Sequence, residues 1–593
     1  MSVQTINDVF FSVVDRNHDR VMQFKQDGRW VPISSRMLYH DVIGTAKTLQ
    51  NWGIGRGDRV AILAENRPEW AIADYATMLI GGIVVPIYAT LTAEQIAFLL
   101  KDAGVRILFL STVEQLRKVE SIRSQTQVEQ IVIMDDAPSA NAVPMRKIRE
   151  SGCKDRDPKF DSEARKMGPD DLATIIYTSG TTGQQKGAML THGNLTANVM
   201  VSMEGFPVEM GKEMYVSFLP LSHVTARHVD YSMFFRGITL AYQPEITKLL
   251  ETLSEVQPTL FVAIPRVYEK IRAGAEAKAS KGLKRSIFQW AMRVGRKNRE
   301  TILRAKAPKS PSWQLANKLI FSKIRHVMGG KARCFISGGA PLGRDLAEWY
   351  ADMGIRIHEG YGLTETSPVI AVNTPAEHRI GSVGKILPNL EVKIAADGEI
   401  LVRGPSVFQG YWNRPEETAN AFEGDWFKTG DIGAVDADGY LSVTDRKKDL
   451  IKTSGGKFIA PQPIESALKS HEMISEAAVL GDRRKFPAVL IRPEFEILEA
   501  WARENGIVFT SRDHLIQHEQ VLSMYNDILQ DVNSRLAQFE KMKKFILIPD
   551  DFTIANGFLT PTMKLRRRAI EERYKREIEA LYTDSAPVPT TVH

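Results

Sequence analysis

The chain has 593 residues, of which 43% are hydrophobic and 25% are charged, so it is long enough for more than one globular domain with a large core. Its formal net charge of +6 is too small to indicate nucleic-acid binding, and its two cysteines form neither a disulfide framework nor a CxxC metal motif. No secretory signal or membrane-spanning segment is expected, so we predict a cytoplasmic protein.

Strands and helices alternate in the first part of the chain. A helix is predicted from Pro68 to about Leu79, and a Thr92/Gln95 capping box predicts another through Lys101. Strands are predicted at residues 58–64, 82–88, 105–110 and 130–134. This alternation predicts a largely parallel sheet built from βαβ units. Residues 135–170 are polar, and we expect them to be irregular.

A glycine- and hydroxyl-rich loop follows the apolar run that starts at Leu172. It reads Tyr177-Thr-Ser-Gly-Thr-Thr-Gly-Gln-Gln-Lys-Gly187, and a helix is expected soon after it, at about 191–203. Glycines permit tight turns, while backbone N–H groups, hydroxyls and Lys186 can bind phosphate oxygens. The spacing is not that of a Walker loop. The alternative is a polar surface loop, but the particular order of residues favours a phosphate site.

Residues 270–310 carry thirteen Lys or Arg against only two acids, Glu276 and Glu300. Apolar residues from Ile287 to Val294 lie among them at helical spacing. A basic amphipathic helix can lie on an anionic membrane, which would make the protein peripheral on the inner face of a membrane. The other interpretation, which we favour, is a solvated helical face that packs on its own domain.

The second half of the chain changes character twice. Strands and a helix continue the α/β pattern through Gly360, and residues 381–443 then contain short strands and many turn signals, which predicts a small β subdomain. After the charged joint at Asp445–Asp449, a second α/β pattern runs to about residue 580. Residues 584–593 are expected to be disordered.

Two further polar clusters occur at the ends of predicted strands, where open α/β sheets bind ligands. Gly360-Tyr-Gly-Leu-Thr-Glu365 fails as a dinucleotide fingerprint because its third glycine is replaced by Glu365, a carboxylate that suits Mg²⁺. Thr429-Gly-Asp431 offers a second carboxylate, suited to ribose hydroxyls. Either cluster alone is more typical of an ordinary turn.

Taken together and in order, the motifs resemble those of the acyl-adenylate-forming superfamily. The matching segments are Tyr177–Gly187, Pro220–His223, Ser337–Pro341, Tyr361–Glu365, Thr429–Asp431, Asp445–Lys452, Ser454–Lys457 and Leu559–Arg566. The Leu-Thr-Pro-Thr-Met-Lys form of the last segment, the Leu-Pro-Leu-Ser-His turn and the basic insertion are similar to long-chain fatty acyl-CoA synthetases. One departure is Gln185, where the family usually has proline.

The resemblance and the patterns predict an α/β fold: a large N-terminal domain of βαβ sheets over residues 1–445, with the β subdomain at about 381–445, and a smaller mobile α/β domain over 446–583. The resemblance also implies roles for individual residues. The β- and γ-phosphates of ATP would be held by Thr178, Ser179, Gly180, Thr181, Thr182 and Lys186, and Mg²⁺ by Glu365 with Thr178. The adenine pocket would include Gly339, Ala340, Glu359, Gly360, Tyr361, Gly362 and Thr364, and the ribose would contact Asp431 and Arg446.

The remaining roles concern the reaction and the motion of the second domain. Lys564 would bridge the fatty carboxylate and the α-phosphate, and Lys448 would be the hinge. Gly455 and Gly456 would approach CoA, and His223 would lie near the acyl pocket. A carboxylate attacks a polyanion in the first step, so cations must offset the repulsion.

The sequence therefore predicts an AMP-forming long-chain fatty acid–CoA ligase with ATP, CoA and a fatty acid as substrates and Mg²⁺ as cofactor. Two alternatives stay open: an acyl-AMP ligase that loads an acyl carrier protein, and a membrane-associated protein that binds acyl groups without turnover. The patterns fix neither acyl chain length nor oligomeric state, and a homodimer is one compatible assembly.

Overall fold

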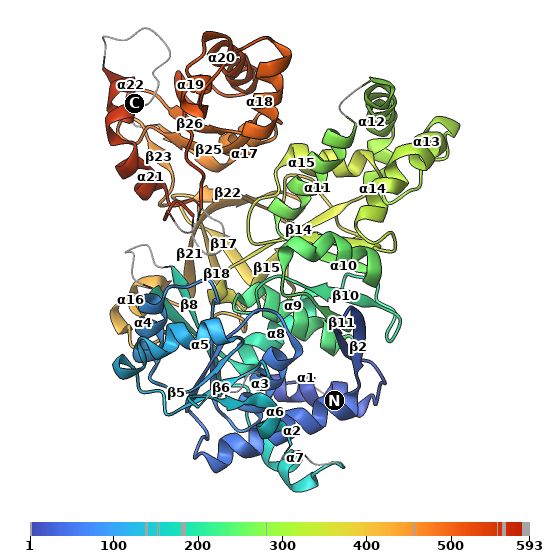
Figure 1. Ribbon diagram of the computed structural model, residues 1–593, viewed down its shortest axis with the longest axis vertical. Helices are drawn as coiled ribbons and strands as arrows, with labels where there is room; N and C mark the ends of the chain where they lie inside the picture. The colour runs from blue at the N-terminus through green and yellow to red at the C-terminus, as the bar shows by residue number, and fades with distance from the viewer. Residues whose placement is uncertain are drawn as a thin grey trace.

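The computed structural model describes residues 3–136, 140–150, 152, 155–179, 185–279, 282–454, 457–553, 556–559 and 565–583, and for Ser179 only the backbone. The chain is mixed α/β, with a large N-terminal domain and a smaller C-terminal domain that lies at one end of it (Figure 1). In the described residues, the hydrophobic clusters of residues 6–441 are separate from those of residues 451–581. The boundary at 445/446 lies between these clusters and stays a prediction.

The first sheet contains the parallel core that the strand–helix alternation predicted. Within the described residues its strand order is β19-β9-β8-β4-β3-β5-β6-β7. Strands β3 to β6 run parallel, while β8, β9 and β19 pair antiparallel at one edge. The strands are β3 (Arg59–Leu63), β4 (Ile83–Ile87), β5 (Val105–Leu110), β6 (Gln130–Ile133), β7 (Val143–Pro144), β8 (Leu172–Ser179), β9 (Gln185–Thr191) and β19 (Gly410–Tyr411).

Helices connect and cover these strands. Helix α3 begins with Pro68 and α4 has the predicted Thr92/Gln95 capping box. The expectation that residues 135–170 are irregular is wrong in part, because the segment contains two short helices. Met145 and Ile148 bury one side of the first helix, and Asp157 caps the second. The helices are α1 (Ile6–Asp15), α2 (Ser35–Asn51), α3 (Pro68–Leu79), α4 (Ala93–Ala103), α5 (Val113–Glu120), α6 (Met145–Arg149), α7 (Pro158–Ala164) and α8 (His192–Ser202).

A second sheet packs beside the first, and the motifs at Pro220–His223, Ser337–Pro341 and Tyr361–Glu365 lie on or next to its strands. Its strand order in the described chain is β16-β15-β14-β13-β12-β10-β11-β1-β2. The strands are β1 (Met22–Gln26), β2 (Arg29–Ile33), β10 (Met214–Ser217), β11 (Thr239–Tyr242), β12 (Leu260–Ala263), β13 (Cys334–Ser337), β14 (Ile357–Gly362), β15 (Val369–Val372) and β16 (Lys385–Ile386). Helices α9 (Val224–Phe235), α10 (Leu249–Val256), α11 (Pro265–Lys278), α12 (Gly282–Leu303), α13 (Pro311–Ala316), α14 (Ser322–Val327) and α15 (Arg344–Asp352) belong to this half.

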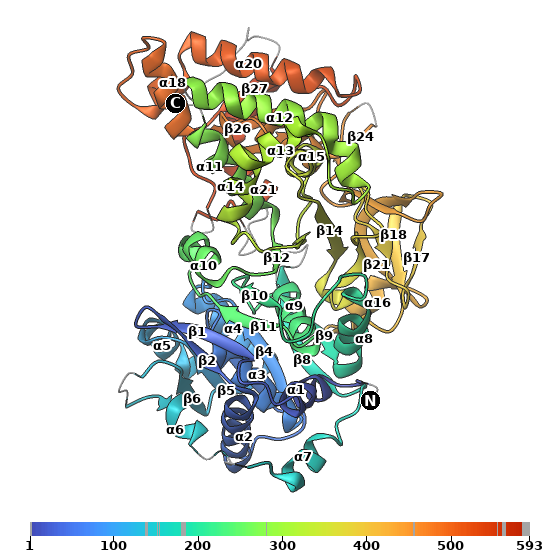
Figure 2. The same ribbon diagram turned by 90° about the vertical axis from the view of Figure 1, so that its right-hand side faces the viewer.

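The predicted β subdomain and C-terminal α/β domain are both present. The subdomain consists of β17 (Glu391–Ile394), β18 (Glu399–Arg403), β20 (Phe422–Glu423), β21 (Trp426–Val435) and β22 (Leu441–Arg446), with α16 (Pro415–Ala421) beside it. The C-terminal domain contains β23 (Ile451–Lys452), β24 (Phe458–Ile459), α17 (Pro461–Lys469), β25 (Ile474–Leu480), β26 (Ala488–Pro493), α18 (Phe495–Glu504), α19 (Arg512–Ile516), α20 (Glu519–Ser534), β27 (Lys544–Leu547), α21 (Arg567–Arg573) and α22 (Lys575–Tyr582). Figure 2 shows the subdomain at the side of the molecule, next to the end of β14.

Candidate adenylation site

The phosphate-loop motif lies on a β-hairpin rather than between a strand and a helix. Thr178 pairs with Lys186 and Tyr177 pairs with Gly187 in the β8–β9 register, and the Thr178 hydroxyl donates to the Lys186 carbonyl at 3.5 Å. Gln185 takes a strand position opposite Ser179, where its N–H can join the ladder as a proline could not. The intervening Gly180, Thr181 and Thr182 lie outside the described residues.

Lys186 and Glu365 are brought together by a tyrosine. The Lys186 Nζ atom lies 5.5 Å from the centre of the Tyr411 ring, and the Tyr411 hydroxyl donates to Glu365 Oε1 at 2.8 Å. Burial, and then the Glu365 carboxylate, raise the pKa of Tyr411, so its hydroxyl stays a donor. Strand β19 fixes this tyrosine because Tyr411 pairs directly with Ala188 of the hairpin.

A second polar group gathers around Asp431. Asp431 opposes Arg446 in the β21–β22 register, and the Arg446 Nε atom lies 2.8 Å from Asp431 Oδ1. The Tyr361 hydroxyl donates to the other carboxylate oxygen at 2.6 Å. Burial, the largest single influence, lowers the pKa of Arg446, but the charges of Asp431, Glu365 and Asp449 together with the Tyr361 hydroxyl outweigh it, and the pKa is raised. Each carboxylate oxygen keeps a second lone pair that can accept a ligand hydroxyl.

Strand β14 supplies Tyr361 to the group around Asp431, and Glu365 follows shortly after the strand ends. Glu359 is the third residue of this strand, and its carboxylate accepts a hydrogen bond from the Leu342 N–H at 3.2 Å, which ties β14 to the chain just after Gly339 and Ala340. Burial raises the pKa of Glu359 to about 7.

The glycines of these motifs differ in whether, and why, the fold requires glycine at the position. A Cβ at Gly362 would lie 1.7 Å from the Pro368 carbonyl oxygen, so packing within the protein requires glycine there. Gly339 has φ +81°, in the left-handed region that glycine tolerates. A Cβ at Gly360 would meet only ordinary contacts at 3.5 Å or more. Thr364 begins the short turn Thr364–Thr366 that carries Glu365.

Two further predicted residues, His223 and Lys448, lie in described parts of the chain. His223 caps the N-terminus of α9, and its Nδ1 atom accepts a hydrogen bond from the Thr225 N–H at 3.1 Å. Lys448 is exposed in the turn after β22, next to Lys447, which forms ion pairs with Asp397 at 2.6 Å and Glu399 at 2.7 Å. Lys564, Gly455, Gly456 and the tail 584–593 lie outside the described residues, as does the side chain of Ser179.

Tyr411, which links Lys186 and Glu365, was not predicted from the sequence. Its signal in the sequence was weak: Gly410-Tyr-Trp412 follows a turn-rich stretch and reads as packing. The same segment fixes the hairpin, because Trp412 donates its indole N–H to the Asp102 carbonyl at 3.1 Å and the Tyr177 hydroxyl donates to the Asp102 carboxylate at 2.6 Å.

Two features are absent from the described residues. No group of three or more His, Cys, Asp or Glu side chains is arranged to hold a metal ion. None of the described helices is both long enough and apolar enough to cross a bilayer.

Comparison with known proteins gives concordant matches over nearly the whole chain. Residues 10–412 match the AMP-binding enzyme family, and residues 448–586 match the AMP-binding enzyme C-terminal domain. Long-chain-fatty-acid–CoA ligase FadD15 of Mycobacterium bovis is 36% identical over 566 residues, covering 94% of this chain and 93% of that protein. Long-chain-fatty-acid–CoA ligase ACSBG2 of Xenopus laevis is 32% identical, covering 99% and 84%. The crystal structure of anthranilate CoA ligase AuaEII with anthranoyl-AMP superposes with a TM-score of 0.75 at 20% identity, covering 98% and 99%.

Proposed function

The chain belongs to the AMP-binding enzyme family, and from this we propose that it is an AMP-forming long-chain fatty acid–CoA ligase. The fatty carboxylate attacks the α-phosphate of ATP, which gives acyl-AMP and releases pyrophosphate. The CoA thiol then attacks the acyl carbonyl, and AMP leaves. The observation that carries this proposal is the proximity of a phosphate-side group, Lys186 and Glu365 joined through Tyr411, to a sugar-side group of Asp431 and Arg446, because the Glu365 charge acts on the pKa of Arg446 and the Arg446 charge acts on the pKa of Tyr411.

The two groups divide the nucleotide between them. Lys186, with Thr178 and the loop from Ser179 to Thr182, would hold the β- and γ-phosphates, since a lysine supplies a point charge to phosphate oxygens. Asp431 would accept from the ribose hydroxyls while its ion pair with Arg446 orients the carboxylate. The adenine would lie along the Gly339–Ala340 turn and β14, from Glu359 to Gly362.

Glu365 fits a magnesium ion bound together with ATP. Its side chain is buried, one carboxylate oxygen accepts from Tyr411, and no hydrogen bond from a described residue reaches the other oxygen. An oxygen donor suits this hard cation, and because no cluster of three such ligands is found among the described residues, phosphate oxygens, water and the Thr178 hydroxyl would supply the rest. When bound, the ion would neutralise charge on the phosphates.

The second domain would complete each half-reaction in turn. Lys564 would offset repulsion between the carboxylate and the α-phosphate, and Gly455 and Gly456 would let pantetheine approach. Both cannot occupy one site, so the C-terminal domain would rotate about Lys448, and His223 would border the acyl pocket.

The basic segment supports a further proposal of contact with an anionic membrane. Helix α12 packs on α15, where a Cβ at Gly295 would lie 2.3 Å from the Asp352 carbonyl, and Ala291, Met292 and Val294 are buried, as the favoured interpretation expected. Its outer face and the following helices are cationic: residues 282–333 contain fourteen Lys or Arg and one acid, and Leu283 and Leu315 are 77% and 50% exposed among them. Sedimentation with anionic vesicles, but not with neutral ones, would support this contact. The homodimer stays a prediction, and analytical ultracentrifugation would measure the oligomeric state.

The experiment for the main proposal measures AMP release with ATP, CoA and fatty acids from short to very long. Release that needs both CoA and a long-chain acid, with acyl-CoA as product, is expected. Acyl transfer only to a carrier protein would favour the acyl-AMP ligase, and no fatty-acid-dependent AMP release would favour a protein without turnover.

A further inference from the structure

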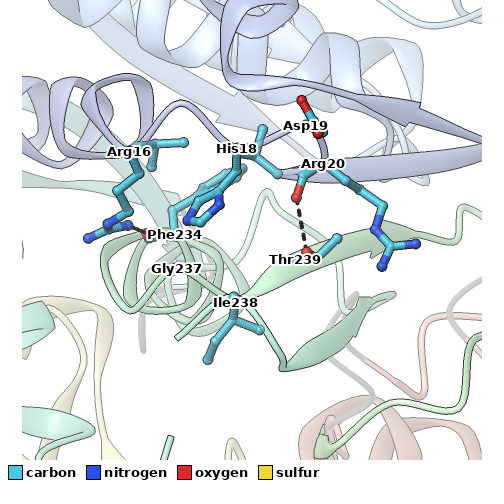
Figure 3. Close-up of a pocket in the computed structure, with 11 residues that line it drawn as sticks. Arg16, His18, Asp19, Arg20, Phe234, Gly237, Ile238 and Thr239 are labelled. Carbon is cyan, nitrogen blue, oxygen red and sulfur yellow. Dashed lines mark hydrogen bonds between the residues drawn. The ribbon is translucent and has the colours of Figure 1, made fainter. Parts of the chain in front are cut away.

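A cavity lies between the N-terminal segment and the C-terminal end of α9, and none of its lining residues belongs to the proposed adenylation site. Its volume is about 250 Å³, near the lower end of small-molecule pockets. The lining residues are Val13, Arg16, His18, Asp19, Arg20, Val21, Gly211, Phe234, Gly237, Ile238 and Thr239. Figure 3 shows the Arg16 and His18 side chains directed from the segment after α1 toward Phe234 and Gly237, whereas the Arg20 side chain extends past Thr239.

Arg16 is held in place at this cavity by backbone carbonyls. Its Nη1 atom donates to the Phe234 carbonyl at 2.7 Å, and its Nη2 atom donates to the Phe235 carbonyl. These two bonds bind the last turn of α9 and use two of the five guanidinium N–H donors. Among the described residues no carboxylate forms an ion pair with Arg16, so its charge is not neutralised by a neighbour.

The other basic residues of the cavity are also without carboxylate partners. No described acid forms an ion pair with Arg20, whose backbone carbonyl, by contrast, accepts from the Thr239 hydroxyl at 3.1 Å. His18 is half-buried and lies against the wall formed by Gly211, where a Cβ would be 3.7 Å from its Cε1 atom. The one acidic lining residue is Asp19, and its carboxylate points away from Thr239 and Ile238 (Figure 3).

We propose that this cavity is a binding site for a small anion that carries a phosphate group. Arg16, His18 and Arg20 line the cavity with only one carboxylate, that of Asp19, so the two guanidinium groups leave an excess of positive charge that an anion would neutralise. Guanidinium groups bind phosphate through paired, charge-assisted hydrogen bonds, and Arg16 is already oriented by the α9 carbonyls, so little side-chain freedom is lost on binding.

The glycines of the wall keep the cavity open. Gly211 and Gly237 have φ of +77° and +69°, and a Cβ at Gly237 would lie 2.7 Å from Met210 Cγ and 3.6 Å from Arg16 Nη1. A residue with a side chain would be strained there and would crowd the Arg16 guanidinium. Arg16 also connects the cavity to α9, whose N-terminal cap is His223.

The test is anion binding by the full chain, followed as thermal stabilisation and by titration calorimetry with inorganic phosphate at constant ionic strength. We expect a saturable rise in Tm for the wild type, because an anion that binds only the folded state stabilises it. Arg20→Gln should weaken the phosphate Kd roughly tenfold or more, since a charge-assisted hydrogen bond is lost. Arg29→Gln, an exposed arginine on the neighbouring strand β2, is the matched control and should leave the Kd unchanged.

Lys186→Ala separates this site from the adenylation site and does not depend on the proposed activity. The phosphate-dependent rise in Tm should persist in Lys186→Ala. Loss of the rise in Lys186→Ala with retention in Arg20→Gln would place the phosphate at the adenylation site and overturn the proposal. The absence of any saturable effect in the wild type, or an equal effect of Arg20→Gln and Arg29→Gln, would also overturn it.

Discussion

Tyr411 touches both charged residues of the phosphate side and carries no charge itself. Its ring lies beneath the Lys186 ammonium, and its hydroxyl occupies one oxygen of Glu365. A lysine and a glutamate this close would otherwise pair directly, and phosphates would then have to break that pair. The tyrosine therefore keeps the cation and the carboxylate oriented and separate, which makes it a positioning residue for adenylation.

Tyr411→Phe should lower the rate of adenylation about tenfold, because it removes one hydrogen bond to a charged group while keeping the ring beneath Lys186. The measurement is fatty-acid-dependent exchange of pyrophosphate into ATP, over a range of Mg²⁺ concentrations. We expect the Mg²⁺ requirement to rise, because Glu365 loses its fixed orientation. Tyr440→Phe, on the β subdomain, is the control. An unchanged Mg²⁺ dependence would contradict the positioning role.

Lys564→Ala should lower adenylation roughly 10²–10³-fold, the size typical of one lost electrostatic contact to the transition state. Thioester formation from supplied acyl-AMP should be largely spared, because no carboxylate meets a polyphosphate in that step. Lys575→Ala, an exposed lysine of α22, should leave both steps unchanged. Equal losses in both half-reactions of Lys564→Ala would contradict a role for Lys564 in adenylation.

At the scale of elements, α9 has an unusual composition for a buried helix. Arg227 and Asp74 form an ion pair in which both side chains are at most 2% exposed, and Tyr231 donates to the same carboxylate at 2.5 Å. Asp230, one residue before this tyrosine, is also buried and accepts from the Ser217 hydroxyl at 3.0 Å. Burial, offset only in part by this bond, raises the pKa of Asp230 to about 8.

The raised pKa of Asp230 predicts a particular pH dependence of stability. The folded protein holds a proton that the unfolded chain releases above its ordinary pKa of 3.8, so this contribution is full at low pH and is lost as the pH rises toward 8. The slope is at most about 1.4 kcal/mol per pH unit for one proton. Asp230→Asn lacks the ionisable group and should not show this loss.

Thermal unfolding of the wild type and of Asp230→Asn between pH 5 and pH 8 tests this expectation. The difference in Tm, wild type minus variant, should decrease as the pH rises. Asp27→Asn, at an exposed turn between β1 and β2, should give a difference that does not vary with pH. Parallel curves for the wild type and Asp230→Asn would show that Asp230 ionises normally.

Local sequence signals predicted the helices and strands that have strong periodicity or caps. The elements that were not predicted depend on pairing with strands distant in the sequence. The Thr92/Gln95 box, Pro68 and the β-branched runs gave α4, α3 and β3 to β6, because their causes are local. Strand β9 was not predicted, since Gln185 to Thr191 reads as a loop leading to a helix until it pairs with β8. Tyr411 escaped for the same reason: its role exists only because β19 joins that hairpin from more than 200 residues away.

The order of the motifs predicted more of the site residues than local sequence patterns alone could. Asp431 and Arg446 are 15 residues apart, and only the β21–β22 pairing makes them opposite neighbours. The resemblance named both residues for the ribose, while their mutual ion pair and the Tyr361 hydroxyl on the same carboxylate came from the structure. A single sequence does not encode such distances in any local pattern.

For the whole molecule, few polar contacts join the two domains. In the described chain, apart from the pairs that Arg446 and Lys447 form at the boundary itself, ion pairs connect Arg266 Nη1 with Glu476 Oε1 at 3.3 Å and Arg535 Nη1 with Asp345 Oδ2 at 3.9 Å. Close to the proposed hinge, the Asp445 carboxylate accepts from the Gln462 N–H at 3.0 Å. Separate hydrophobic clusters and a sparse polar interface are what a domain that rotates as a body requires, because breaking the interface then costs little.

The Arg266–Glu476 pair stabilises the observed arrangement of the domains over any other. Its partners are 37% and 12% exposed, so removing it should cost about 0.5–1 kcal/mol, or roughly a two- to fivefold shift in the population of this arrangement. Arg266→Ser should therefore slow the half-reaction that uses this arrangement and leave the other unchanged or faster. Single-turnover rates of acyl-AMP formation and of thioester formation measure the two steps separately.

Arg272→Ser is the control for this last prediction, because Arg272 pairs with Glu276 within α11 and does not cross between the domains. Glu476→Gln should reproduce the effect of Arg266→Ser, and the double variant should add little, since both remove the same contact. If the two half-reactions fell equally in Arg266→Ser, the pair would serve general stability and not the balance between domain positions. Opposite effects on the two steps would place the observed arrangement in one half of the cycle.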